Sequence, residues 1–242
     1  MLTRVFLLAA LVGLLLTACG TPAQPTPVPS PTPAPREISA AIGRATQTGQ
    51  SVHFLIELSG KPVPIDASGM LILTTLEGDL KRPNDVLALL NVTLNGAIAE
   101  IRTISLAGQQ YVTNPITRQW GCLAPASAFD PAILFAPDKG IESLLQTGIQ
   151  EVSLVGTEPI AGRPTYHLRG TIAGAQLQPI SLNLLGAGPV AVDLWADVET
   201  MRATRLILVD TATNPTTPTT WSISFSDYDK TVTVRAPVAA CP

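Results

Sequence analysis

Charged side chains are scarce in this sequence, and no region is strongly basic. Asp, Glu, Lys and Arg make up 14% of the 242 residues, whereas they usually make up about 25% of a soluble globular domain. The formal net charge is −3 and no run rich in Lys and Arg occurs, so we expect no nucleic acid as a partner. Because 46% of the residues are hydrophobic, few charges are available to cover a large apolar surface.

Histidine is rarer still, and the motifs of common enzyme classes are missing. The sequence contains no GxSxG, HExxH, CxxC, P-loop or GxGxxG motif. Both histidines, His53 and His167, fall in strand-like segments, and two histidines cannot complete a zinc site without carboxylates. Asp193 and Asp197 flank Trp195 and form a candidate carboxylate pair, for which a solvated strand face is the simpler interpretation. We therefore expect no enzyme, no metal site and no cofactor.

Residues 1–19 have the pattern of an export signal that ends in a cysteine. One positive charge, at Arg4, precedes an apolar run that is too short for a membrane-spanning helix with ordinary flanks. The residues from Leu16 to Cys19 resemble the lipobox of bacterial lipoproteins, which implies cleavage before Cys19 and attachment of a diacylglycerol to its thiol. Each buried methylene of such chains, palmitate among them, contributes about 0.8 kcal/mol, so two or three chains hold a protein firmly on a membrane. The alternative is an ordinary secretory signal with an incidental cysteine.

A proline-rich segment follows this cysteine. Residues 20–35 contain seven prolines, which favour polyproline II and make a semi-rigid spacer of about 3.1 Å per residue. We expect a signal peptide over residues 1–18, a lipidated cysteine and linker over residues 19–36, and one domain over residues 37–242, long enough for its own core. The predicted location is the extracytoplasmic face of a bacterial cell membrane, with a lipid anchor.

Two cysteines remain once Cys19 is assigned to the lipid. An even number of cysteines in a protein outside the cytoplasm is typical of a disulfide. We therefore predict a bond between Cys122 and Cys241. Two unpaired thiols are the alternative.

The domain alternates between helical and strand-like patterns. Apolar residues recur at helical spacing over residues 38–45, and residues 52–58 have the period of a half-buried strand. Short strands continue to residue 114, and two short helices are predicted over residues 130–135 and 139–147. Two strands, a short helical piece and three strands follow. This order predicts an α+β fold in which one large antiparallel sheet curves into a half-barrel, with helices packed on its concave side.

Four segments resemble the mycobacterial LppX/LprAFG lipoprotein family in their order and in scattered residues. They are NGAIAEIRTISLAGQQYVTNPITRQW, AFDPAILFAPDKGIESLLQ, LVGTEPIAGRPTYHLRGTI and PVAVDLWADVETMRATRLIL. The residues that carry the resemblance lie at turns, helix starts and strand centres: Tyr111, Trp120, Asp130, Pro131, Gly140, Leu144, Leu145, Gly162, Tyr166, His167 and Trp195. The similarity covers about residues 37–236 and is specific as a series.

The resemblance implies a fold similar to the lipoprotein carriers LolA and LolB, with an apolar cavity between sheet and helices. In that family the cavity holds acyl chains of glycolipids or phospholipids, and the proteins are thought to help move such lipids outward from the cytoplasmic membrane. The partners it implies are a lipid or glycolipid ligand and the membrane. It identifies neither a catalytic residue nor a membrane transporter that would exchange the lipid.

Several segments, such as LILTTL, DVLALL and RLILV, are apolar on both faces of a strand, although helices cover only one face. Aromatic residues make up only 5% of the sequence, so a hydrocarbon ligand is a candidate for filling the interior. Nine apolar residues on strands or on the middle helices are our candidates for the cavity lining: Phe54, Ile56, Ile72, Val92, Leu94, Ile101, Leu134, Leu144 and Leu145. Each also suits an ordinary core, in which case the protein is a structural or adhesive surface lipoprotein with a protein partner.

Overall fold

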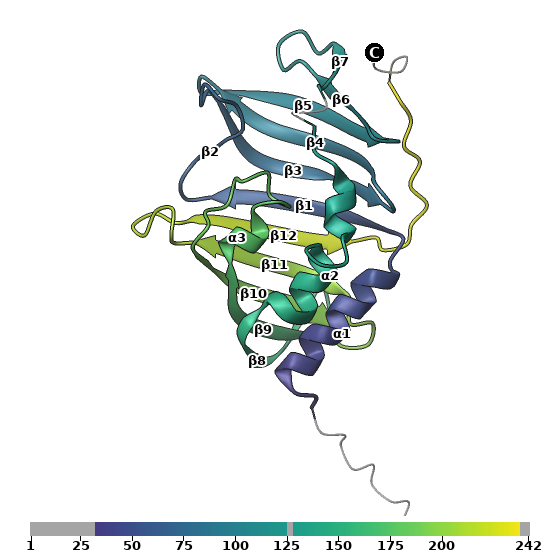
Figure 1. Ribbon diagram of the computed structural model, residues 1–242, viewed down its shortest axis with the longest axis vertical. Coiled ribbons are helices and arrows are strands. Elements are labelled where there is room, and N and C mark those ends of the chain that lie inside the picture. The colour runs from purple at the N-terminus through teal and green to yellow at the C-terminus, as the bar shows by residue number, and fades with distance from the viewer. Residues whose placement is uncertain (1–31, 125–127, 238–242) are drawn as a thin grey trace, which may run out of the picture. The chain divides into compact units, whose positions relative to one another are not determined.

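The computed structural model describes residues 32–124 and 128–237. Residues Pro33–Pro242 form one compact unit, built from a large sheet and few helices (Figure 1). The helical elements are α1 (Pro35–Thr48), the 3₁₀ helix η2 (Pro131–Phe135), α2 (Ile141–Ser143), the π-helical turn η3 (Leu144–Gly148) and α3 (Gly174–Leu177).

Within the described residues, the strands belong to a single antiparallel sheet of 12 strands. They are β1 (Ser51–Ser59), β2 (Val63–Pro64), β3 (Leu71–Lys81), β4 (Asp85–Leu94), β5 (Ala97–Leu106), β6 (Gln109–Thr113), β7 (Trp120–Cys122), β8 (Gln150–Ile160), β9 (Arg163–Ala173), β10 (Pro189–Asp197), β11 (Ala203–Asp210) and β12 (Thr219–Ser226). The order across the sheet is β7-β6-β5-β4-β3-β1-β12-β11-β10-β9-β8, and β2 pairs with β3 beside this path.

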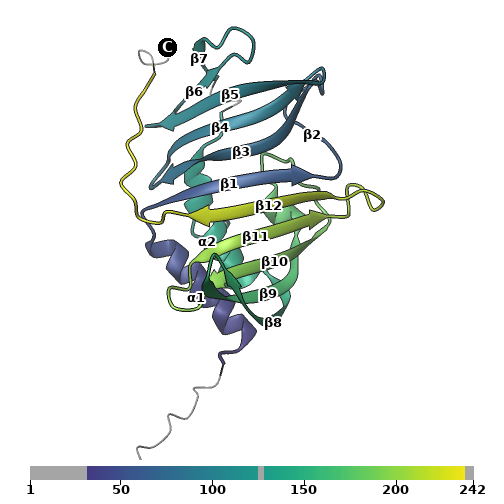
Figure 2. The same ribbon diagram turned by 180° about the vertical axis from the view of Figure 1, so that it is seen from behind.

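Tight turns build each half of the sheet from neighbouring strands. Asn95 and Gly96, between β4 and β5, both have positive φ angles of 51° and 83°, the backbone of a two-residue hairpin that an Asn-Gly pair favours. The two halves meet where β1 pairs with β12, placing Leu58 opposite Trp221. The first and last strands therefore lie side by side in the middle of the sheet (Figure 2).

The helices cover one face of the sheet, which we call the inward face (Figure 1). Figure 2 shows the opposite, outward face, with the helices behind the strands. Helices α1 and α3 and the turn η3 contact β8 and β9, so the helical cover lies mainly over the half of the sheet from β8 to β12. The predicted α+β fold, with one large antiparallel sheet and helices on one side, is confirmed.

Helix α1 forms where the sequence predicts an amphipathic helix. Pro35 occupies the first turn, where a missing N–H costs nothing, and the buried positions Ile38, Ser39, Ile42 and Gly43 share one face. Ser39 Oγ donates a hydrogen bond of 2.5 Å to the carbonyl of Leu145. A Cβ on Gly43 would lie 2.5 Å from Gln146 Cγ, so glycine permits this close approach between α1 and the α2–η3 segment.

The other short elements differ in detail from the sequence prediction. The helix expected over residues 139–147 is a short α-helix followed by a π-helical turn. The helical piece expected around residues 175–186 is limited to Gly174–Leu177. Strands β2 and β7 were not predicted, because two or three residues are too few to show a periodicity.

Candidate functional site

The register of the sheet determines which side chains point inward. Residues directly opposite each other on neighbouring strands share a face, and Ile56, Leu76, Leu90 and Ile101 form one such row across β1, β3, β4 and β5. A parallel row continues through Leu58 and Trp221 into the other half of the sheet. The inward face is therefore apolar along these rows, from β5 across β1 to β12.

The helix-covered half of this face is a close-packed core. Apolar residues of β9 to β12, α1, η3 and α3, together with Val63 of β2 and the connecting residues Ile149 and Leu185, form one buried cluster, which we call the helix-covered cluster. Its members are Ile38, Ile42, Val63, Leu144, Leu145, Ile149, Leu168, Ile172, Leu177, Leu185, Val190, Val192, Leu194, Ala196, Ala203, Leu208 and Trp221. Half-buried apolar residues pack against this cluster toward β1, among them Leu206, Ile223 and Phe225.

The half formed by β3 to β6 is different. Only Leu73, Val92 and Ile101 are buried in its cluster, and the apolar residues around them are half-buried: Leu58, Ile65, Leu71, Leu90, Ala99 and Val112. The inward positions of β5 include the short side chains Ala99 and Thr103. We call this region the open inward face. It presents apolar surface that the protein covers incompletely, so it is the candidate binding site.

The nine predicted lining residues divide among three places. Phe54, Ile56, Val92, Leu94 and Ile101 all share the inward face by register, as a common lining requires.

Leu144 and Leu145, in η3, are each 6% exposed and belong to the helix-covered cluster, while Leu134 is half-buried in η2. Ile72 pairs with Thr93, next to the inward pair Leu73 and Val92, and therefore points outward. The structure thus places five of the candidates together on the sheet, puts three in the covering segment and separates Ile72 from all of them.

One functional group on the inward face escaped the sequence analysis. Trp221, on β12, is 6% exposed, and no residue in the described part of the chain accepts a hydrogen bond from its indole Nε1. A buried N–H without an acceptor costs roughly 1–3 kcal/mol. The alternation of Trp221, Ile223 and Phe225 along TTWSISFS was the signal that could have placed this indole inward.

Two hollows of the structure lie away from the open inward face, and their linings are mainly polar. One, of about 200 Å³, is on the outward face and is lined by Glu100, Arg102, Thr113, Arg118 and Trp120. The other, of about 340 Å³, is lined by Gln47, Pro137, Glu142, Ser143, Gln146 and Thr147 at the helices. Neither has the apolar lining that a hydrocarbon chain requires.

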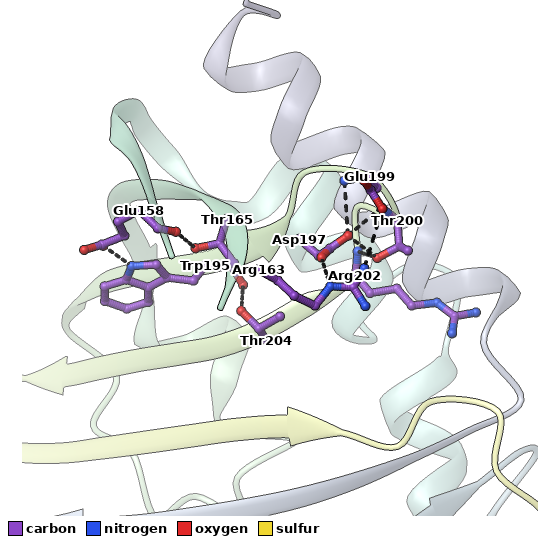
Figure 3. Close-up of polar contacts among 9 residues, drawn as sticks. All are labelled: Glu158, Arg163, Thr165, Trp195, Asp197, Glu199, Thr200, Arg202 and Thr204. Atoms are coloured by element: carbon purple, nitrogen blue, oxygen red, sulfur yellow. Dashed lines mark hydrogen bonds and ion pairs between the residues drawn. The ribbon is translucent and has the colours of Figure 1, made fainter. Parts of the chain in front are cut away.

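The outward face carries a polar network around His167. Its ring stacks on Trp195 with the centroids 4.1 Å apart, and its nitrogens lie 2.6 Å from Asp193 Oδ1 and 3.1 Å from Glu158 Oε1. Glu158 also accepts a hydrogen bond from Trp195 Nε1 (Figure 3). Over residues 32–124 and 128–237, no group of His, Cys, Asp and Glu is placed to hold a metal ion. The network joins β8, β9 and β10 on the face away from the candidate site.

The two aspartates that flank Trp195 do not act as a pair. Asp193 contacts His167, whereas Asp197 accepts 2.7 Å from Arg163 Nε and 2.8 Å from the amide of Thr200 (Figure 3). Burial by itself would raise the pKa of Asp197, but the hydrogen bonds from Thr200 and Arg163 hold that pKa below its ordinary value. Asp197 therefore stays ionised and stabilises the turn between β10 and β11.

The predicted lipid and disulfide sites fall largely outside the described residues. Cys19 and Cys241 lie outside them, and Cys122 lies at the end of β7. Both assignments therefore stay predictions. In the part of the chain that the structure describes, no helix is long and apolar enough to span a membrane.

Comparisons with known proteins agree with the architecture. The sequence profile of the LppX_LprAFG lipoprotein family matches residues 34–234. The structure of LprF from Mycobacterium bovis is similar, with a TM-score of 0.67 and 20% identity over 87% of this chain and 100% of the LprF chain. LppX from Mycobacterium tuberculosis has a TM-score of 0.59 and 18% identity over 83% of this chain and 98% of its own. No curated protein sequence is significantly similar.

Proposed function

Because the chain belongs to the LppX_LprAFG lipoprotein family, we propose that it is a non-enzymatic carrier of lipids at the bacterial cell envelope. In this proposal Cys19 anchors the chain to the extracytoplasmic face of the cell membrane, and the proline-rich segment holds the domain at a distance from it. The domain binds the acyl chains of a lipid or glycolipid and carries or presents that lipid.

The open inward face is the observation that carries this proposal. In one continuous sheet, the β8–β12 half buries most of its inward apolar side chains under helices, although Leu206, Ile223 and Phe225 there are half-buried. In the β3–β6 half the buried cluster has three members, and Leu71, Leu90, Ala99 and Val112 around it are half-buried. A soluble domain gains about 25 cal/mol for each Å² of apolar surface removed from water. A ligand with long chains supplies that cover, and its affinity is expected to rise with chain length more than with the nature of the head group.

Native mass spectrometry of the domain tests the proposal. Pro33–Pro242 is a compact unit, and the crystallised LprF chain is matched along its whole length, so the domain can be expressed without its anchor. We expect protein purified from a lipid-rich host to carry additional mass that organic extraction releases as acyl lipid. Its affinity for added phosphatidylglycerols is expected to increase with acyl length. Protein that carries no lipid and takes up no fluorescent acyl probe would contradict the proposal.

A structural or adhesive surface lipoprotein is the second candidate function. It is favoured by the close packing of the helix-covered cluster, where Leu144, Leu145 and Ile149 are all buried, and by the polar lining of both hollows. On this alternative a protein partner covers the open inward face. The same experiment separates the two functions, because only a carrier retains lipid.

A further inference from the structure

The indole groups of Trp195 and Trp221 differ in their hydrogen bonding. Trp195 Nε1 on the outward face donates to Glu158, whereas Trp221 Nε1 on the inward face is buried with no acceptor among the described residues. Most buried polar groups in folded proteins are hydrogen-bonded, and an exception is explained by strain, by a buried water or by a group from outside the chain.

Trp221 stands at the border between the filled and the open parts of the inward face. It belongs to the helix-covered cluster and lies opposite Leu58 on β1 and Leu208 on β11. Leu58 packs against both the helix-covered cluster and the cluster of β3 to β5. One half-buried residue, Leu58, therefore separates the indole from the surface on which we place the acyl chains, and a ligand atom reaches the buried Nε1 only when Leu58 moves aside.

We infer that Trp221 Nε1 donates a hydrogen bond to an ester carbonyl of the bound lipid. The inference rests on the proposed carrier function and names a residue that recognises the ligand. Hydrocarbon chains offer no acceptor, but the carbonyl that joins each chain to its head group does, and it enters the apolar region together with the chain. Few polar groups compete at this position, and low polarity strengthens the bond. The bond fixes how deeply the chain lies along the sheet.

The carbonyl distinguishes ester lipids from ether lipids of the same shape. The domain is incubated with an equimolar mixture of dipalmitoyl phosphatidylglycerol and its dihexadecyl ether analogue, and bound species are counted by native mass spectrometry. We expect wild type to prefer the ester by about 3- to 10-fold, the effect of one hydrogen bond. Trp221→Phe keeps an aromatic ring but loses the donor, so its preference is expected to approach one. Trp195→Phe is the matched control and keeps the wild-type preference.

Nuclear magnetic resonance of the wild type provides a readout that does not depend on Trp221→Phe folding. The sequence contains three tryptophans, and the indole N–H signals can be assigned from Trp120→Phe and Trp195→Phe. The Trp221 signal is expected to move downfield when the ester lipid binds and to move less with the ether lipid. A merely structural indole would respond equally to both.

The outcomes separate the inference from the function on which it rests. If both lipids bind equally well to wild type and to Trp221→Phe, with equal indole shifts, a buried water or no group satisfies the indole, and the inference is wrong while the carrier function stands. If neither lipid binds, the carrier function fails and the inference fails with it.

Discussion

The guanidinium group of Arg82, at the turn between β3 and β4, pairs with the carboxylate of Glu142 in α2. Arg82 also donates to the carbonyls of Gly49 at 2.8 Å and Thr46 at 3.2 Å, and lies 3.9 Å above the ring of Phe135. Glu142 is 5% exposed, and burial lowers the pKa of Arg82. One side chain of the open half of the sheet therefore holds α1, η2 and α2 in place.

We expect Glu142→Ala to lower the free energy of unfolding by about 2–3 kcal/mol, because it leaves a charged guanidinium group partly buried without its partner. This loss lies below the roughly 3–5 kcal/mol typical of fully buried pairs, because Arg82 is partly exposed and keeps its two carbonyl acceptors. Urea unfolding measures it. Glu57→Ala, at an exposed glutamate on β1, is the control and is expected to change stability by less than about 0.5 kcal/mol. Equal effects of the two substitutions would show that the pair does not hold the helices.

The lowered pKa of Asp197 predicts a pH dependence of stability. Its hydrogen bonds favour the carboxylate in the folded protein, so its contribution is fully present above the ordinary value of 3.8 and is lost as the pH falls through the lower folded value. We expect Asp197→Asn to lower stability at neutral pH and to flatten its decline below about pH 4. Thermal unfolding over a pH series measures this. A parallel decline in wild type and variant would contradict the assignment.

Lipidation at Cys19 is tested by cell fractionation. Cys19→Ala removes the thiol that accepts the lipid, so we expect loss of acyl labelling and release of the processed protein from the membrane fraction. Cys122→Ala, which leaves the lipobox intact, is the control and stays with the membrane. A Cys19→Ala protein that is processed and still membrane-bound would rule out the lipobox interpretation.

The predicted disulfide between Cys122 and Cys241 closes a long loop. In the chain-entropy model such a bond contributes about 4–5 kcal/mol, and less if it is strained. Protein taken from its native compartment is expected to resist thiol labelling until it is reduced, and reduction is expected to lower the unfolding temperature. Labelling of both cysteines before reduction would contradict the bond.

The sequence was most informative where periodicity is strong. Ile38 and Ile42 predicted the buried face of α1, and the alternation over residues 52–58 predicted β1 and its inward residues. The face of Ile72 could not be assigned in the same way, because Leu71, Ile72 and Leu73 are consecutive apolar residues. Without an alternation of apolar and polar residues, the sequence does not show which side chains point inward. The register with β4 settles the question.

Local sequence patterns predict neither which distant strands pair nor which polar groups become buried. The pairing of Leu58 with Trp221 joins strands from the two ends of the domain, and no local pattern specifies such a partner. Glu142 resembled any surface glutamate until the fold placed it beside Arg82. For the same reason the missing acceptor of Trp221 became visible only in the folded chain.

Lipid occupancy of two neighbouring variants on β5 tests the central claim most directly. Ala99 is half-buried on the open inward face, whereas Ile98, the preceding residue, points outward and is 83% exposed. Ala99→Trp fills the proposed acyl site with an indole, and Ile98→Trp adds the same group to the other face.

We expect native mass spectrometry to show wild-type lipid occupancy for Ile98→Trp and a loss of most bound lipid for Ala99→Trp, with both variants folded by circular dichroism. Equal occupancy in the two variants, or no lipid in either of them or in wild type, would contradict a carrier that binds acyl chains on its open inward face.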